Sequence, residues 1–126
     1  MAFMISRIYN RAVPSFIEFI DVKKSFGDRT VLDQVSFGVE PGETFAILGP
    51  SGAGKTVTLT LAVGLLKPDG GRIIVDGEEI TNMQERQLAP IRRKVQLVFQ
   101  SGALFDSLTV AENVAFPLNE IGIAHV

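Results

Sequence analysis

Apolar positions along the chain follow two different spacings, which indicates a mixture of strands and helices. β-Branched and aromatic residues fill Phe16–Val22, and apolar residues alternate with small or polar ones in Val35–Val39, so both segments are predicted strands. Thr44–Leu48 and Val95–Phe99 are almost continuously apolar. That pattern is typical of strands that are buried on both faces of a parallel sheet.

A helix and a hairpin are predicted between those two apolar segments. Lys55–Leu66 has helical periodicity, and one face of the predicted helix carries Leu59, Ala62, Val63 and Leu66. The dipeptide Asp76-Gly77 separates Arg72–Val75 from Glu78–Ile80. Because Asp-Gly favours two-residue turns between antiparallel strands, these segments are predicted to form a hairpin.

Two shorter helices are predicted in the second half of the chain. The polar stretch around Glu85–Leu88 is a predicted helix that Pro90 closes. Thr109 and Glu112 have the spacing of a capping box, which marks the start of another helix. We expect Pro117 to end that helix.

A glycine-rich loop joins the apolar segment 44–48 to the predicted helix and fits the pattern G-x-x-x-x-G-K-[ST]. Its residues are Gly49, Pro50, Ser51, Gly52, Ala53, Gly54, Lys55 and Thr56. Glycines allow a tight turn whose N–H groups surround phosphates, and the helix directs its positive end at the same place. Lys55 would bind the β- and γ-phosphates, and Thr56 would bind Mg²⁺. The loop therefore predicts a site for a nucleoside triphosphate with Mg²⁺, against the alternative of a mere strand–turn–helix. The family resemblance given below implies that the nucleotide is ATP.

Composition narrows the classes of protein that remain. The chain has 126 residues, enough for one domain, with an extension predicted over 1–15 and the domain over 16–126. The formal net charge is −2 and no long basic run is present, which argues against nucleic acid as a partner. Cysteine is absent, so disulfides and thiolate metal sites are excluded. No signal peptide or membrane-spanning segment is predicted, and we expect the chain in the cytoplasm or on the cytoplasmic side of a membrane.

Three features of the sequence indicate a family: Phe26 ahead of the loop, Pro50-Ser51-Gly52-Ala53 within it, and Gln100 after the second apolar strand. With these features, the sequence from about Ile17 to Leu118 resembles the ATPase subunit of ABC transporters. The resemblance implies an α/β fold, in which a phosphate-loop core is interwoven with an antiparallel β-subdomain. It also implies that Phe26 stacks on adenine, although tyrosine is commoner there, and that Gln100 reaches Mg²⁺ and the attacking water. The alternatives are core packing for Phe26 and an ordinary surface role for Gln100.

The segment Ser101–Phe105 resembles a narrower group, the bacterial lipid-transport ATPases that work with MCE-domain proteins. This resemblance implies an ATPase that drives transport of phospholipid or another lipid from the cytoplasmic face of the inner membrane. The implied partners are transmembrane permease subunits, a second copy of the ATPase subunit in a homodimer, and an MCE-domain protein.

Several family features are absent, so the chain is expected to cover about the first half of the ATPase domain. The missing features are the signature Leu-Ser-Gly-Gly-Gln, the metal-binding aspartate with its catalytic glutamate, and the switch histidine. Asp76 and Glu78 imitate the metal-binding pair but are better explained by the hairpin. The charged run Arg92–Lys94 is expected to be solvated, and His125 is expected to have no role. A nucleotide-binding module without hydrolysis and a soluble ABC-type ATPase of DNA repair or translation remain as alternatives.

Overall fold

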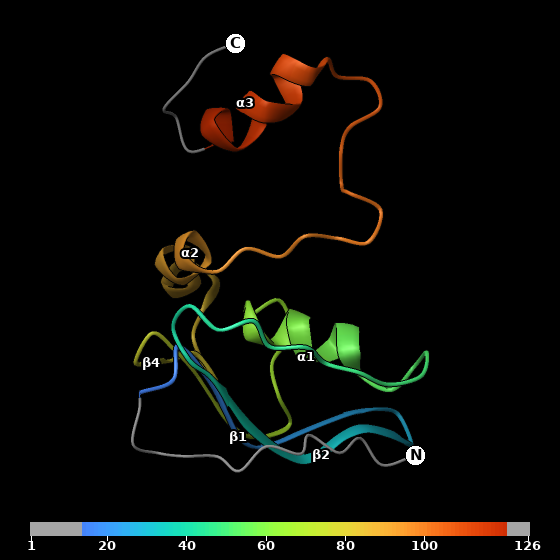
Figure 1. Ribbon diagram of the computed structural model, residues 1–126, viewed down its shortest axis with the longest axis vertical. Helices are drawn as coiled ribbons and strands as arrows, with labels where there is room; N and C mark the ends of the chain where they lie inside the picture. The colour runs from blue at the N-terminus through green and yellow to red at the C-terminus, as the bar shows by residue number, and fades with distance from the viewer. Residues whose placement is uncertain (1–13, 121–126) are drawn as a thin grey trace.

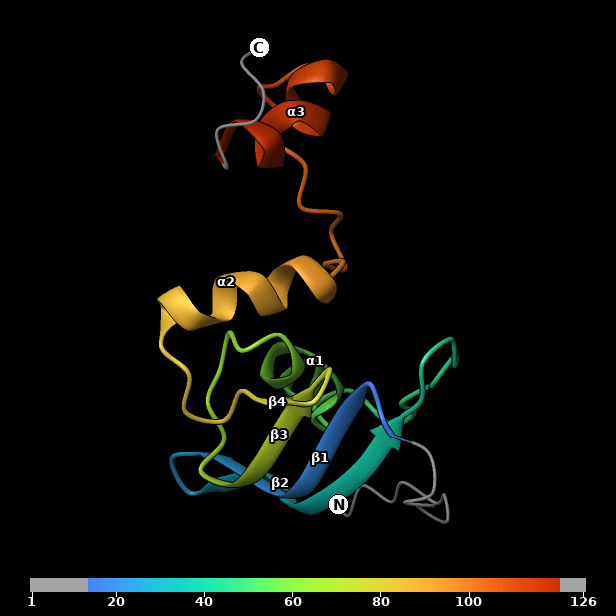
Figure 2. The same cartoon turned by 90° about the vertical axis from the view of Figure 1, so that its left-hand side faces the viewer.

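A four-stranded antiparallel sheet forms the base of the molecule in this computed structural model, which describes residues 14–120 (Figures 1 and 2). The strand order is β2-β1-β3-β4. The strands are β1 (Ile17–Phe26), β2 (Arg29–Val39), β3 (Gly70–Val75) and β4 (Glu78–Glu79). His125 and nearly all of the extension predicted over 1–15 lie outside the described residues.

The strands β1 and β2 extend beyond the predicted strands 16–22 and 35–39 and form a hairpin. Both strands continue to a two-residue turn, so that Phe26 pairs with Arg29 across Gly27 and Asp28. Irregularities in the register accommodate the strongly bent strands, and Asp21 and Gln34 have positive φ angles of 48° and 50°. The tip of this hairpin carries two side chains of the candidate site described below.

The helix α1 (Lys55–Ala62) covers one face of the sheet and is shorter than the predicted Lys55–Leu66. The predicted buried face is confirmed in part, because Ala62 and Val63 are buried. Thr58 and Leu61 are fully buried, whereas Leu59 is 47% exposed. Gly54, directly before the helix, is itself buried against β2, and positions 54, 58 and 61 share one helical face. The packing of the loop therefore sets which face of α1 turns inward.

The helix α2 (Glu85–Lys94) passes through Pro90, so the prediction that Pro90 closes it is wrong. Proline removes one hydrogen bond from a helix interior, and tertiary contacts compensate here. Ile91 is fully buried in the core, and Arg92 donates hydrogen bonds to the carbonyls of Val63 and Gly64. These contacts hold the second half of the helix against the end of α1.

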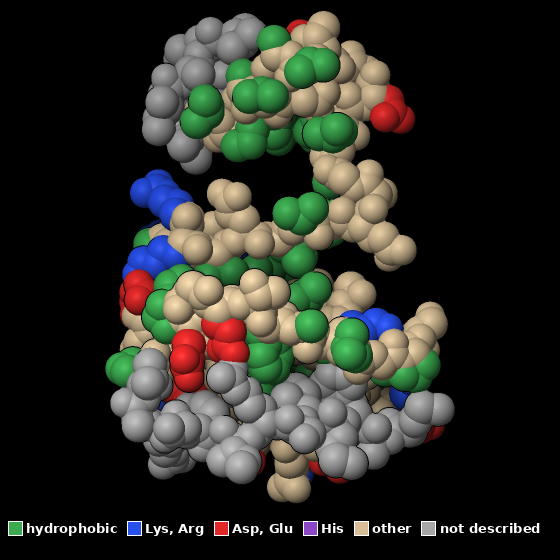
Figure 3. All heavy atoms as spheres, viewed as in Figure 1, with side chains coloured by type: hydrophobic (Ala, Val, Ile, Leu, Met, Phe, Trp, Pro, Cys, Tyr) green, Lys and Arg blue, Asp and Glu red, His purple; other side chains and the backbone are tan. Residues whose placement is uncertain are grey.

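The helix α3 (Val110–Glu120) starts at the predicted capping box and also continues past its proline. The N–H of Thr109 donates to the Glu112 carboxylate at 2.7 Å, and the N–H of Glu112 donates to the Thr109 hydroxyl at 3.3 Å. Pro117 lies inside the helix, so the prediction that it ends the helix is wrong. A connector separates α3 from the sheet (Figures 1 and 2), and exposed apolar side chains lie over this part of the surface (Figure 3).

Thr44–Leu48 and Val95–Phe99 form no strands, which corrects both predictions. A strand needs a neighbour for its backbone groups, and among residues 14–120 neither segment pairs with another strand. Both segments also lack the predicted burial, because Leu48 is 82% exposed and Val98 is 86% exposed. The predicted Asp76-Gly77 hairpin, in contrast, is confirmed: the turn joins β3 to β4 with positive φ at both residues.

The core lies between the sheet and the helices α1 and α2. Phe37 stacks between Phe19 and Phe45, with ring centroids 4.6 and 5.1 Å apart. Leu61 and Ile91 contribute the helical side of the same cluster. None of the helices in the described part of the chain is long and apolar enough to cross a membrane.

Candidate functional site

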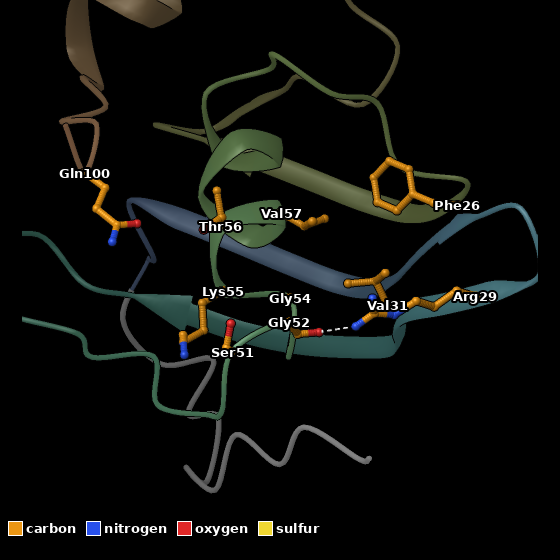
Figure 4. A pocket seen from close by; sticks show the side chains of 10 residues that line it. All are labelled: Phe26, Arg29, Val31, Ser51, Gly52, Gly54, Lys55, Thr56, Val57 and Gln100. Atoms are coloured by element: carbon orange, nitrogen blue, oxygen red, sulfur yellow. Dashed lines mark hydrogen bonds between the residues drawn. The ribbon is translucent and has the colours of Figure 1, made fainter. Parts of the chain in front are cut away.

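A pocket of about 570 Å³ lies where the β1–β2 hairpin, the glycine-rich loop and the first turn of α1 meet (Figure 4). It is lined by Phe26, Arg29, Val31, Ser51, Gly52, Gly54, Lys55, Thr56, Val57 and Gln100. The structure thus brings Phe26, most of the loop and Gln100 to one place, although they come from separate parts of the sequence. Gly49, Pro50 and Ala53 belong to the loop but do not line the pocket.

Two glycines give the loop its shape. Gly52 and Gly54 have φ angles of 79° and 95°, whereas Gly49 does not have a positive φ. At Gly54 an added Cβ would lie 2.9 Å from Cγ1 of Val31 and 3.3 Å from its carbonyl oxygen. Glycine is therefore required at 54 both for its backbone angle and for its close approach to β2.

Lys55 lies across the mouth of the loop. Its ammonium donates hydrogen bonds to the carbonyl oxygens of Gly49 and Pro50, the latter at 3.2 Å. The N–H of Ala53 donates to the Pro50 carbonyl at 3.1 Å and closes the turn. Gly49, Pro50 and Ala53 therefore support the position of Lys55 through backbone atoms rather than through side chains in the pocket.

Arg29 is a pocket residue that the sequence analysis missed. Its guanidinium donates a hydrogen bond of 2.7 Å to the carbonyl oxygen of Gly52. Val31 and Val57 were missed as well. The only signal in the sequence is the position of Arg29 three residues after Phe26, and its meaning depends on both strands continuing to the turn between these residues.

The pocket is positively charged although the chain as a whole is not. Arg29 and Lys55 are the charged residues in its lining, and no carboxylate is among the lining residues. The chain has a formal net charge of −2. This local excess of positive charge, beside the N-terminus of α1, favours an anionic ligand.

Thr56 and Gln100, the residues assigned to a metal, share the wall of this pocket and of a neighbouring cavity of about 740 Å³. Both side chains are exposed and offer neutral oxygen atoms. Among residues 14–120 no group of three or more His, Cys, Asp or Glu side chains could hold a metal ion. Such a sparse donor set fits Mg²⁺ that is held mainly by water and ligand phosphates.

Asp76 and Glu78, the imitation of a metal-binding pair, lie in the β3–β4 hairpin and do not line the pocket. Lys94 binds both carboxylates, at 2.7 and 3.4 Å. These ion pairs join the end of α2 to the hairpin. The charged run 92–94 is therefore only partly solvated, because Arg92 and Lys94 make structural contacts.

Phe26 is 47% exposed and does not belong to the core, contrary to the alternative of core packing. The ammonium of Lys24 lies 5.4 Å from the centre of its ring, a cation–π contact. Asp69 accepts hydrogen bonds from this ammonium at 3.1 Å and from the N–H of Ser25 at 2.7 Å. The Ser25 N–H and then Lys24 hold the pKa of Asp69 below its ordinary value. The tip of the hairpin is thus fixed beside the pocket.

The sequence pattern of the ABC transporter family matches residues 32–125. A relative named spermidine/putrescine import ATP-binding protein PotA, from Nitrosomonas europaea, is 46% identical over 86% of this chain and 28% of its own length. The intermembrane phospholipid transport system ATP-binding protein MlaF of Escherichia coli K12 is 42% identical over 87% of this chain and 41% of its own length. The chain therefore spans less than half of each of these relatives.

The fold matches solved structures of the ATP-binding cassette MJ0796, a bacterial ABC transporter cassette. Its dimeric structure superposes with a TM-score of 0.75 and 33% identity, over 87% of this chain and 49% of the cassette. A post-hydrolysis state of the same cassette, bound to ADP and Pi, gives the same TM-score with 31% identity. The predicted fold class, an α/β fold of the ABC ATPase type, is confirmed. The chain belongs to the ABC transporter family and carries part of that family's ATP-binding domain.

Proposed function

We propose that the pocket binds ATP together with Mg²⁺, and that this chain is the nucleotide-binding part of an ABC transporter ATPase subunit. The observation that carries the proposal is the convergence of Phe26, the loop 49–56 and Gln100 on one positively charged pocket. No single segment of the chain supplies all of these groups. Their meeting supports a ligand that has both an aromatic and an anionic end.

The phosphates are assigned to the loop and the start of α1. Gly52 and Gly54 turn the backbone around the ligand, and the N-terminal N–H groups of α1 face the same pocket. Lys55 exchanges its hydrogen bonds to the Gly49 and Pro50 carbonyls for bonds to the terminal phosphates. A charged acceptor is favoured in this exchange because charge-assisted hydrogen bonds are stronger than those to a neutral carbonyl.

The metal is assigned to Thr56 and Gln100. The Thr56 hydroxyl lies at the first turn of α1, and Gln100, which follows the segment 95–99, lines the same pocket (Figure 4). Bound Mg²⁺ would neutralise charge that develops on the phosphates during transfer. Gln100 can both accept and donate a hydrogen bond, so its amide can orient a water beside the terminal phosphate.

The base is assigned to Phe26. The ring makes a cation–π contact with Lys24. Its side chain is nevertheless half-exposed and lines the pocket. A flat aromatic surface at the hairpin tip suits stacking on adenine. In this arrangement the base of the nucleotide lies at Phe26 and the terminal phosphates lie at Lys55 of the same pocket.

For the whole protein we propose ATP hydrolysis that drives transport at the cytoplasmic face of the inner membrane. Two ATPase subunits would pair, as the dimeric MJ0796 cassette does, and would dock on transmembrane permease subunits. Phospholipid is the proposed cargo, with an MCE-domain protein as a further partner. The segment Ser101–Phe105 and the 42% identity to MlaF support this cargo.

Polyamine import is the second candidate, favoured by the 46% identity to PotA. The two cargoes are separated by reconstituting the whole transporter in proteoliposomes and measuring ATP turnover with labelled phospholipid or with spermidine. Stimulation or transport of phospholipid alone supports the lipid assignment. Spermidine uptake without lipid movement would replace it.

The two remaining alternatives are also separable. Nucleotide binding by the whole protein without phosphate release would identify a non-hydrolytic module. Salt-dependent binding of DNA or RNA would favour an ATPase of repair or translation instead of a transporter.

The nucleotide assignment is tested by Lys55→Ala, with affinity for a fluorescent ATP analogue as the measurement. We expect a loss of about a hundredfold, because a charge-assisted contact to the terminal phosphates disappears. Lys67→Ala is the matched control, since Lys67 is exposed and does not line the pocket. Equal affinities of the wild type and Lys55→Ala would remove the proposal.

A further inference from the structure

We propose that Arg29 is an additional nucleotide-binding residue of this pocket and that its guanidinium binds the α-phosphate. This inference rests on the proposed function, because it assumes that the ligand is a nucleotide. Arg29 lies outside the glycine-rich loop, and the α-phosphate is not among the groups assigned to Lys55 or Thr56.

The position of Arg29 is fixed by the loop itself. Its Nη2 atom donates a hydrogen bond of 2.7 Å to the Gly52 carbonyl, and a Cβ added at Gly52 would lie 2.9 Å from the same nitrogen. The guanidinium therefore lies directly against the backbone of the loop. A side chain at 52 would push it away, so Gly52 makes room for Arg29 as well as for the turn.

Most of the hydrogen-bonding capacity of Arg29 remains available to a ligand. A guanidinium has five N–H donors, and within the described part of the chain one hydrogen bond is recorded from this one. Among residues 14–120 no carboxylate forms an ion pair with Arg29. The group lines the pocket as a cation that is held in place without being neutralised.

The location of the Arg29 guanidinium in the pocket indicates which part of the nucleotide it contacts. Arg29 lies three residues after Phe26 at the hairpin tip, and its guanidinium reaches toward Gly52, between Phe26 and Lys55 (Figure 4). With the base on Phe26 and the terminal phosphates on Lys55, the ribose and the α-phosphate occupy the middle. Only the α-phosphate of these two is anionic. Guanidinium groups match phosphate oxygens in both charge and geometry.

A purely structural role makes a different prediction. If Arg29 only held Gly52 in place, its loss would disturb the loop and weaken binding of the terminal phosphates, while AMP would bind as before. If Arg29 binds the α-phosphate, every ligand that contains this phosphate is affected. AMP is therefore the diagnostic ligand.

The experiment measures competition of ATP, ADP, AMP and adenosine against a fluorescent ATP analogue on the wild type, Arg29→Gln and Arg29→Lys. Glutamine keeps a donor but removes the charge. We expect Arg29→Gln to weaken ATP, ADP and AMP by about tenfold each and to leave adenosine unchanged. Arg29→Lys should recover part of the loss, and Arg93→Gln is the control, because Arg93 is exposed on α2 and outside the pocket.

Three results overturn the inference: unchanged affinities in Arg29→Gln, a loss confined to ATP and ADP, or an equal loss for adenosine. The last would mean that the adenine end was disturbed. Failure of the proposed function has a separate signature, since the wild type would then not bind ATP or would bind it independently of Lys55. The two failures are therefore distinguishable when Lys55→Ala is titrated beside the Arg29 variants.

Discussion

At the scale of single residues, the candidate site depends on two glycines, because a Cβ at either position would collide with a neighbouring residue. Gly52 leaves room for the Arg29 guanidinium, and Gly54 lets the loop lie directly on Val31. The loop pattern alone indicates that glycines are needed there, because they permit positive φ. The contact of Arg29 with Gly52 could not be predicted, since it depends on where a separate hairpin ends.

Gly54 offers the sharpest prediction at this scale. Gly54→Ala should destabilise the protein by about 3 kcal/mol, because both the positive φ and the crowding by Val31 oppose a methyl group. Gly42→Ala is the matched control, with φ of 75° and nothing within 4 Å of an added Cβ, and should cost about 1 kcal/mol. Urea denaturation measures both. Equal losses would show that the contact with β2 contributes nothing.

At the scale of elements, turn and capping signals predict the structure, whereas continuously apolar composition and the helix-ending prolines do not. The Asp76-Gly77 hairpin and the Thr109 capping box depend on neighbouring residues, and both are present in the structure. The composition of Thr44–Leu48 predicts a strand, but a strand also needs a neighbour, which no local pattern reveals. Pro90 was expected to end a helix that distant contacts of Arg92 and Ile91 maintain.

The attachment of the hairpin tip predicts a dependence on pH. The pKa of Asp69 lies below its ordinary value because of the Ser25 N–H and Lys24, so its carboxylate stabilises the fold at neutral pH. That contribution is lost as the pH falls from the ordinary value near 4 through the lowered pKa. Asp69→Asn should therefore lower the urea midpoint at pH 7 and have little effect near pH 2.

Asp28→Asn is the control for Asp69→Asn, because Asp28 lies in the turn of the β1–β2 hairpin that Asp69 contacts, and no hydrogen bond or ion pair of its side chain is recorded in the described residues. An equal effect of Asp69→Asn at both pH values would contradict the role assigned to the carboxylate. The same comparison at pH 7 also reports on the site, since a released hairpin tip should weaken ATP binding through Phe26.

At the scale of the whole molecule, large apolar side chains remain on the surface. Leu48 and Val98 are more than four-fifths exposed, and Leu104 and Val114 are 72% and 70% exposed. Exposed apolar surface of this extent is typical of interfaces or of aggregation-prone states. The positively charged pocket lies beside part of it, because Gln100 directly follows the exposed segment 95–99.

We therefore expect the isolated 126-residue chain to be weakly stable and prone to aggregation. Light scattering during thermal unfolding measures this, and Val98→Lys should reduce the scattering because it places a charge on the exposed segment. The control is Val75→Lys, which should prevent folding because Val75 is fully buried. A sharp, reversible transition of a soluble monomer would contradict the expectation.

The most direct test of the central claim is to map the nucleotide site by NMR. Backbone amide shifts are recorded while Mg²⁺–ATP is titrated into the protein. The account predicts the largest changes at Gly52, Gly54, Lys55 and Thr56, with further changes at Phe26 and Gln100, and none at the Asp76-Gly77 hairpin. Unchanged shifts around the pocket, or changes centred elsewhere, would contradict it.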